Sequence, residues 1–203
     1  MKKKRWLLFA LIMVLLAAWL GEVIWVNAYY RRITDPYSVA VFHQGDTVEL
    51  GTNIYGAKQK AEGCTIIVDS AMMQDFDTYI EEVGFEKPSF YAEMEQKVLL
   101  VEMTLMTGEC ENEYFVLNDF IAHGVDQTFH IDPRLMQYIN PEMGEYLSIS
   151  IEKNTTYHLK IPFIVVADIL PEDWDHLEQY PIRMVLTLSP VQQEVALDIT
   201  YKE

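Results

Sequence analysis

Positive charge is scarce in most of this sequence. Past Arg32 the chain has 9 lysines and arginines against 30 aspartates and glutamates, a net charge of −21. A surface of this sign repels nucleic acids and anionic lipid headgroups, so we expect no nucleic-acid partner. The acidity is typical of a solvated extracellular surface, and it also suits cationic partners or divalent ions.

Cysteine is scarce throughout, since Cys64 and Cys110 are the only two. They lack the C-x-x-C spacing of redox and zinc sites, which argues against both classes. Cys64 shares its parity with Ile66 and Val68 and is predicted to point inward, whereas Cys110 lies in the acidic turn 108–113. An exported domain can oxidise such a pair, so the sequence leaves two states open, free thiols and a disulfide.

Sequence motifs of the common enzyme classes are also missing. The sequence contains no G-x-S-x-G, H-E-x-x-H, P-loop or G-x-G-x-x-G motif. We therefore predict a protein that is not an enzyme, with no catalytic residue and no cofactor.

Two groups of side chains have the chemistry of metal ligands. Histidines with carboxylates can hold zinc, and clustered carboxylates can hold calcium. A polar loop explains the first group equally well, and a solvated acidic helix explains the second, which lacks the EF-hand pattern. We predict no metal site in either. The first group is Asp119, His123, Asp126, His130 and Asp132, and the second is Asp168, Glu172, Asp173, Asp175 and Glu178.

Long apolar runs are absent except at the N-terminus, where Trp6–Leu20 is unbroken. Extending the run to Val26 gives about 21 residues, long enough for a helix across a hydrocarbon core of about 30 Å. Residues 1–5 are mostly basic, which predicts a cytoplasmic tail, a transmembrane helix over 6–26 and an extracytoplasmic remainder. Cleavage of a signal peptide near Ala28 is the alternative, and it predicts a secreted protein.

Beyond a tether over residues 27–43, the pattern predicts one domain over residues 44–203. Apolar residues alternate with polar ones at the period of half-buried strands. One to three short helices are expected: one after the second strand, capped by Asp77 and ended by Gly84, one that starts at Pro133 and runs over Arg134–Ile139, and a helix or turn over Pro171–Tyr180. Pro162 predicts an edge or a bulge in its strand. Strands are expected over residues 48–54, 64–68, 98–106, 114–122, 147–152, 157–165, 182–188 and 195–201.

The fold class that follows is mainly β, an antiparallel sandwich with one to three short helices. Four segments carry a resemblance: Gln44-Gly45-Asp46-Thr47-Val48, Val98–Leu105, Leu117-Asn118-Asp119-Phe120 and Tyr157–Val165. Together with the N-terminal anchor, they resemble uncharacterised, membrane-anchored, immunoglobulin-like extracytoplasmic domains of Gram-positive bacteria. The resemblance implies an immunoglobulin-like sandwich and a place in the cell envelope, and it implies no functional residue.

The function we expect is that of a membrane-tethered binding or accessory module whose partner is a membrane complex or another envelope protein. The alternative is a sensor that binds calcium, zinc or a small ligand through its acidic loops. Aromatic side chains can form a partner surface, although core packing explains them equally. The aromatic candidates are Phe85, Phe90, Tyr91, Trp174 and Tyr180.

Overall fold

The computed structural model describes the chain in two compact units, residues 1–37 and 38–203, which we treat separately. In the first unit, residues 19–26 are helical. Across the described part of the chain, no helix combines the length and the apolar character that crossing a membrane requires. The predicted cytoplasmic tail and most of the predicted anchor and tether lie outside the described residues. Those described are residue 13 and residues 19–26, 38–55, 59–88, 95–124, 127–144, 147–167 and 174–202.

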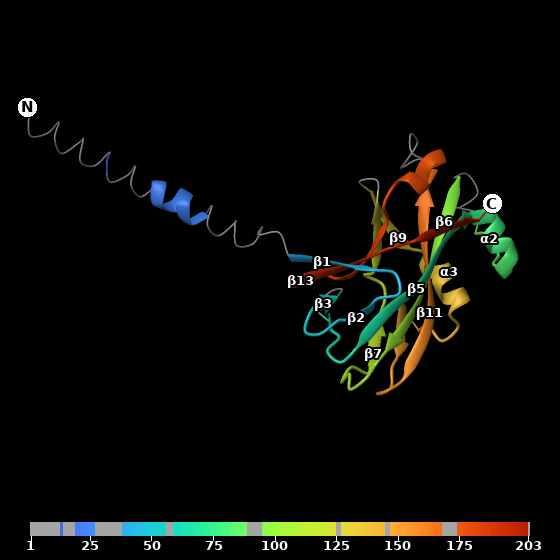
Figure 1. Cartoon of the computed structure of the whole chain (residues 1–203), viewed down its shortest axis with the longest axis horizontal. Helices are drawn as coiled ribbons and strands as arrows, with labels where there is room; N and C mark the ends of the chain where they lie inside the picture. Colours follow the sequence, from blue (N-terminus) through green and yellow to red (C-terminus); the bar gives the residue numbers. More distant parts are fainter. Residues whose placement is uncertain are drawn as a thin grey trace, which may run out of the picture. The chain divides into compact units, whose positions relative to one another are not determined.

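The second unit is built mainly from strands, as predicted, with three short helices among its described residues (Figure 1). The helices are α2 (Phe76–Val83), α3 (Pro133–Ile139) and the 3-10 helix η4 (Trp174–Gln179). The strands are β1 (Ser38–His43), β2 (Thr47–Glu49), β3 (Ile54–Tyr55), β4 (Gln59–Lys60), β5 (Thr65–Asp75), β6 (Gln96–Met106), β7 (Tyr114–Val116), β8 (Ile121–Gly124), β9 (Gln127–Ile131), β10 (Ser148–Ser150), β11 (Thr156–Val166), β12 (Arg183–Thr187), β13 (Val191–Ala196) and β14 (Ile199–Lys202).

Ten of these strands form one sheet in the order β1-β13-β12-β8-β9-β11-β6-β5-β14, with β2 also paired to β5. Most neighbours are antiparallel, but β1 runs parallel to β13 and β14 runs parallel to β5. The long strands β5, β6 and β11 pair along most of their length, and they form one half of the sheet. The antiparallel prediction is therefore correct for most pairs and wrong for the two outermost ones.

The sheet curls until its two ends approach each other. Strand β13 lies next to one end of the strand order, and β14 forms the other end. Only Leu197 and Asp198 separate these two strands along the chain. The turn at residues 44–46 likewise joins β1, at one end, to β2, near the other. In that turn the Gly45 amide donates to the Val68 carbonyl at 2.9 Å. These short connections require a nearly closed sandwich.

The core lies inside this curled sheet. The alternation of strand residues buries one face of each strand, including Leu105, Phe115 and Phe163, all 0% exposed. A second apolar cluster covers the outer face of β6, where Val98 and Leu100 pack with residues of α2 and α3. Strand β6 is therefore buried on both faces from Val98 to Val101.

The helix boundaries follow from their caps. Asp75, not Asp77 as predicted, caps α2 by accepting a hydrogen bond from the Thr78 amide at 2.8 Å. Gly84 ends α2 in the left-handed conformation, as predicted. Helix α3 begins at Pro133 as predicted, and the side chain of Asp132 accepts from the Leu135 amide at 2.7 Å.

Three expectations are wrong in detail. Residues 38–43 belong to the sheet as β1 rather than to the tether, because they pair with β13. The predicted last strand over residues 195–201 is two strands, since the chain leaves β13 at Ala196 and starts β14 at Ile199. Pro162 lies in an interior strand, but β9 pairs with β11 only at Phe163 and Ile164, so the missing proline N–H interrupts no ladder there.

Candidate functional site

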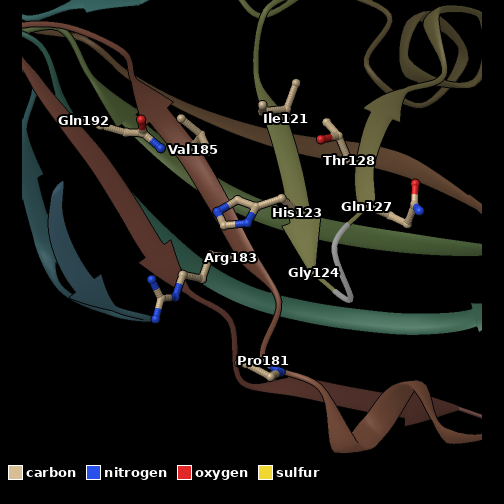
Figure 2. A pocket seen from close by; sticks show the side chains of 9 residues that line it. All are labelled: Ile121, His123, Gly124, Gln127, Thr128, Pro181, Arg183, Val185 and Gln192. Carbon is tan, nitrogen blue, oxygen red and sulfur yellow. The ribbon is translucent and has the colours of Figure 1, made fainter. Parts of the chain in front are cut away.

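An open depression of about 500 Å³ lies on the outer face of the sheet, where β8, β9, β12 and β13 meet. Figure 2 shows the His123 ring in the middle of the lining side chains, with Arg183 on one side and Thr128 on the other. We call this hollow the sheet depression. Its lining residues are Ile121, His123, Gly124, Gln127, Thr128, Pro181, Arg183, Val185 and Gln192.

The strand register explains why these side chains meet. His123 on β8 lies opposite Arg183 on β12 and opposite Thr128 on β9, so the three side chains form a row across neighbouring strands. Because side chains alternate between faces, the adjacent residues Ala122 and Met184 point into the core and are fully buried. The core packing of these strands thus fixes the row on the outer face.

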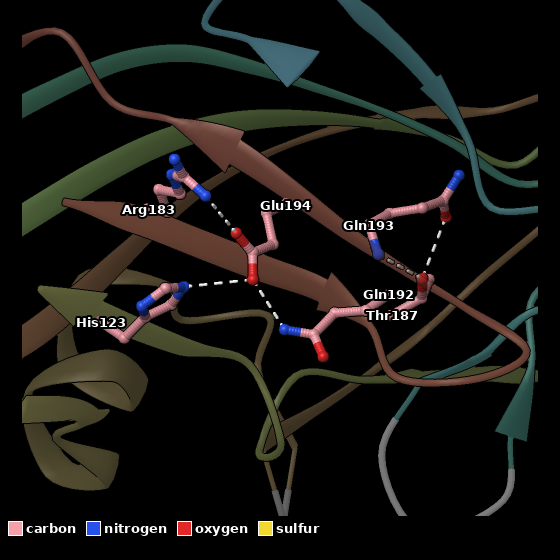
Figure 3. Close-up of polar contacts among 6 residues, drawn as sticks. All are labelled: His123, Arg183, Thr187, Gln192, Gln193 and Glu194. Atoms are coloured by element: carbon pink, nitrogen blue, oxygen red, sulfur yellow. Dashed lines mark hydrogen bonds and ion pairs between the residues drawn. The ribbon is translucent and has the colours of Figure 1, made fainter. Parts of the chain in front are cut away.

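A buried carboxylate forms the polar centre of the sheet depression. Glu194 on β13 is 3% exposed. Its Oε2 accepts a hydrogen bond from Arg183 Nη1 at 3.1 Å, and its Oε1 accepts from Gln192 Nε2 at 2.6 Å (Figure 3). A carboxylate so removed from water requires such partners, because an unpaired buried charge is strongly destabilising.

His123 stands beside the same carboxylate without completing a hydrogen bond. Its Nε2 lies 3.2 Å from Glu194 Oε1, close enough for an ion pair when the ring is protonated. The nitrogen is nevertheless buried and has no partner in hydrogen-bond geometry. The remainder of the side chain is partly exposed, so the ring can still meet a molecule that enters the depression.

A second set of polar contacts braces β13 from the side away from His123. The Thr187 hydroxyl donates to the Val191 carbonyl at 2.9 Å, and the same hydroxyl accepts from the backbone N–H of Gln193 at 3.1 Å. The Gln193 side chain donates across the sandwich to the Glu49 carbonyl at 2.9 Å. These bonds hold the strand that carries Glu194.

The sequence profile of a domain of unknown function, DUF5028, matches residues 39–193. The chain belongs to this family. The match begins in β1 and ends in β13, so the DUF5028 region contains nearly all of the sandwich and every lining residue of the sheet depression. No curated protein and no solved structure shows significant similarity to the chain.

The DUF5028 domain does not bring the first predicted ligand group together. His123 faces Glu194, whereas His130 is an exposed residue of β9 and Asp132 caps α3. Asp119 lies in the turn before β8, and Asp126 lies outside the described residues.

Of the second predicted group, Asp175 and Glu178 lie on η4, and the other three carboxylates are not among the described residues. Among the described residues of the DUF5028 domain and its flanks, no three histidine, cysteine or acidic side chains converge as metal ligands.

The predicted aromatic surface is largely packing where it is described. Trp174 is 8% exposed, and its indole donates to Glu95 Oε1 at 2.7 Å. The Phe85 ring meets the Tyr138 ring edge-on at 5.2 Å, and Tyr180 is exposed. The other two aromatics of the group lie outside the described residues.

Sequence reasoning missed the residues that matter most in the sheet depression, namely Arg183, Gln192 and Glu194. A signal was present: Arg183 is the only charged residue of its strand, and Glu194 directly precedes the core residue Val195, which places its carboxylate on the opposite face of the sheet. Their convergence depends on the β12–β13 register, which no local pattern contains. One enzyme-type spacing, S-x-x-K, occurs in the sequence at Ser150–Lys153, and both of those residues are exposed.

Proposed function

We propose that this protein is a membrane-tethered, extracytoplasmic binding module without catalytic activity, and that the sheet depression is its recognition surface. The observation that carries the proposal is the open hollow built over Glu194, a buried carboxylate that Arg183 and Gln192 hold in place. Replacing a buried ion pair by apolar residues often leaves stability unchanged, so stability alone does not require this charge network. Recognition of a partner gives a reason for it.

The lining of the sheet depression is rich in hydrogen-bond donors. Arg183 uses one nitrogen on Glu194 and carries further N–H groups, and Gln127, Thr128 and Gln192 add amide and hydroxyl donors. Such a lining complements carbonyl and carboxylate oxygens. The partner we propose is therefore an extended segment of another envelope protein that presents these acceptors.

The strand order supports an immunoglobulin-like origin for the sandwich. In immunoglobulin domains the strands called C, F and G form one sheet in that order. Here β8, β12 and β13 follow the same order, and β1 lies parallel to β13. One departure is that β9 pairs with β11, so that these strands belong to a single sheet, whereas an immunoglobulin domain has two.

The proposed location rests on the apolar run over residues 6–26 and on the basic residues before it. The uncleaved anchor retains the module at the membrane, and cleavage near Ala28 would release it outside the cell. A thiol reagent that cannot cross membranes tests this location. Ser38→Cys, with Cys64 and Cys110 replaced by serine, should react on intact cells. Reaction only after lysis would contradict export.

Photocrosslinking in intact cells tests the recognition surface. Thr128 and Thr200 are matched sites, because both are exposed strand threonines and only Thr128 lines the sheet depression. A benzophenone amino acid at position 128 should crosslink one envelope protein, the same residue at position 200 should not, and Arg183→Gln should abolish the product. Equal crosslinking at both positions, or a product insensitive to Arg183→Gln, would contradict the proposal.

Divalent ions provide the test of the alternative function. Saturating binding to the folded state raises the melting temperature. A rise for the full chain in millimolar calcium or zinc would favour the ion sensor, and an unchanged melting temperature would remove the calcium and zinc versions of that alternative.

A further inference from the structure

The two cysteines of the chain lie side by side at one corner of the sandwich. Cys64 directly precedes β5 and Cys110 lies in the loop after β6, and the two residues are 1% and 2% exposed. A Cβ atom at Gly63, the residue before Cys64, would lie 3.0 Å from the Cys110 amide nitrogen, and both cysteines belong to the same buried cluster. The chain thus brings together two thiols that are far apart in the sequence.

Two tight turns hold this corner in place. The Cys64 amide donates to the Ala61 carbonyl and the Cys110 amide to the Thr107 carbonyl, each at 2.8 Å. A Cβ atom at Gly108 would lie 2.6 Å from the Gly63 carbonyl oxygen, so the two turns approach each other through backbone atoms. We call this region the turn corner. Because backbone contacts set its geometry, the thiols remain adjacent without a covalent bond.

The surroundings of the thiols decide when they can react. Burial and the neighbouring Cys110 raise the pKa of the Cys64 thiol far above its usual range. The thiolate is the reactive form, so the folded, reduced chain presents little nucleophile to an oxidant. Oxidation is therefore expected before the corner closes, and an existing bond is shielded from reductants afterwards.

We propose that Cys64 and Cys110 form a structural disulfide that closes during folding. In the first step one thiolate attacks an external disulfide, such as oxidised glutathione or the disulfide of an exported thiol oxidase, and a mixed disulfide forms as one external thiol leaves. The second cysteine thiolate then attacks its partner's sulfur in the mixed disulfide and releases the other external thiol. The protein loses two protons and two electrons, and the external disulfide is reduced to two thiols.

The bond would close a loop of roughly 45 residues and restrain the unfolded chain. For a loop of that length we expect the ratio of unfolded to folded molecules to fall by about thirty- to a thousand-fold. Its formation in cells rests on the proposed export, because the cytosol keeps thiols reduced. Its formation by the purified chain does not depend on export.

Refolding the full chain in detergent, with a mixture of oxidised and reduced glutathione, tests the pairing. Alkylation in denaturant followed by mass measurement should find a monomer about 2 Da lighter than the reduced chain, with no free thiol and no glutathione adduct. The double variant Cys64→Ser with Cys110→Ser should have the same unfolding curve in oxidising and reducing buffer, whereas the native sequence should unfold at higher denaturant when oxidised.

Two free thiols, or stable glutathione adducts, after refolding would overturn the proposal. So would an oxidised chain that unfolds at no higher denaturant than the reduced one. Alkylation of acid-quenched cells separates the two proposals. A bond that forms in the purified chain but is missing in cells would support the pairing and contradict the export.

Discussion

The sheet depression and the turn corner are both places where distant parts of the chain meet, but different groups hold them together. In the depression, side chains do so: Arg183 and Gln192 reach Glu194 through charge-assisted hydrogen bonds beside an opening to solvent. In the corner, the backbones at Gly63 and Gly108 approach each other directly.

The difference teaches which residues can change. There is no room for a side chain at Gly108, because a Cβ atom there would clash with the Gly63 carbonyl oxygen. Packing therefore fixes the identity of that residue. The charges of the sheet depression are exchangeable in principle, because apolar residues of similar volume can fill the same place. We infer that the corner serves stability and that the depression serves recognition. The predictions below test that division.

The largest loss of stability is expected for Gly108→Ala. The new Cβ atom would meet the Gly63 carbonyl oxygen at 2.6 Å, and residue 108 has a φ of +40°. Clash and backbone strain together should cost about 3 kcal/mol in denaturant unfolding. Gly51→Ala is the matched control, because Gly51 has a φ of +57° with nothing within 4 Å of the added atom, and it should lose only about 1 kcal/mol. Equal losses would show that the corner is not tightly packed.

The next largest loss is expected for Arg183→Met, which leaves the Glu194 carboxylate buried with one charged partner fewer. We expect about 2 kcal/mol, less than for a fully buried pair because Arg183 is partly exposed. Adding Glu194→Leu removes the stranded charge, so the double variant should recover most of this loss. A double variant less stable than Arg183→Met would mean that the charge network serves stability after all.

A smaller effect on the free energy of unfolding is expected from pH when both cysteines of the turn corner are reduced. The pKa of Cys64 is raised by burial in the folded chain, whereas an unfolded cysteine titrates near 8.5. Above that pH the unfolded chain releases a proton that the folded chain keeps, so stability is complete below pH 8.5 and falls as the pH rises. Between pH 8 and 9.5 the reduced chain should lose about 1 kcal/mol. The oxidised chain has no thiol to titrate, and a similar loss there would assign the effect to other groups.

The smallest effect on stability is expected at the rim of the sheet depression. Thr128→Ala changes an exposed side chain, and the free energy of unfolding should stay within about 0.5 kcal/mol of the native value. The same change should weaken crosslinking from a probe at the neighbouring position Gln127, because a donor is lost. A large stability change with normal crosslinking would reverse the roles that we assign.

Local patterns predicted the elements better than their assembly. The strand around Val101 and the helix from Pro133 were correct because alternation and capping are local signals. The separation of β13 from β14 was missed, since Val195 and Ile199 share one parity across a break that only the curled sheet requires. The Arg183–Glu194 pair was missed for the same reason, because it depends on strand register.

The division between recognition and stability is tested most directly by the double variant Arg183→Met with Glu194→Leu. The probe would be placed at Thr128, and crosslinking in intact cells would be compared with denaturant unfolding of the same purified chain. The account predicts that the variant stays folded, within about 1 kcal/mol of the native chain, and loses the crosslinked envelope partner. A variant that unfolds readily, or one that keeps its partner, would contradict it.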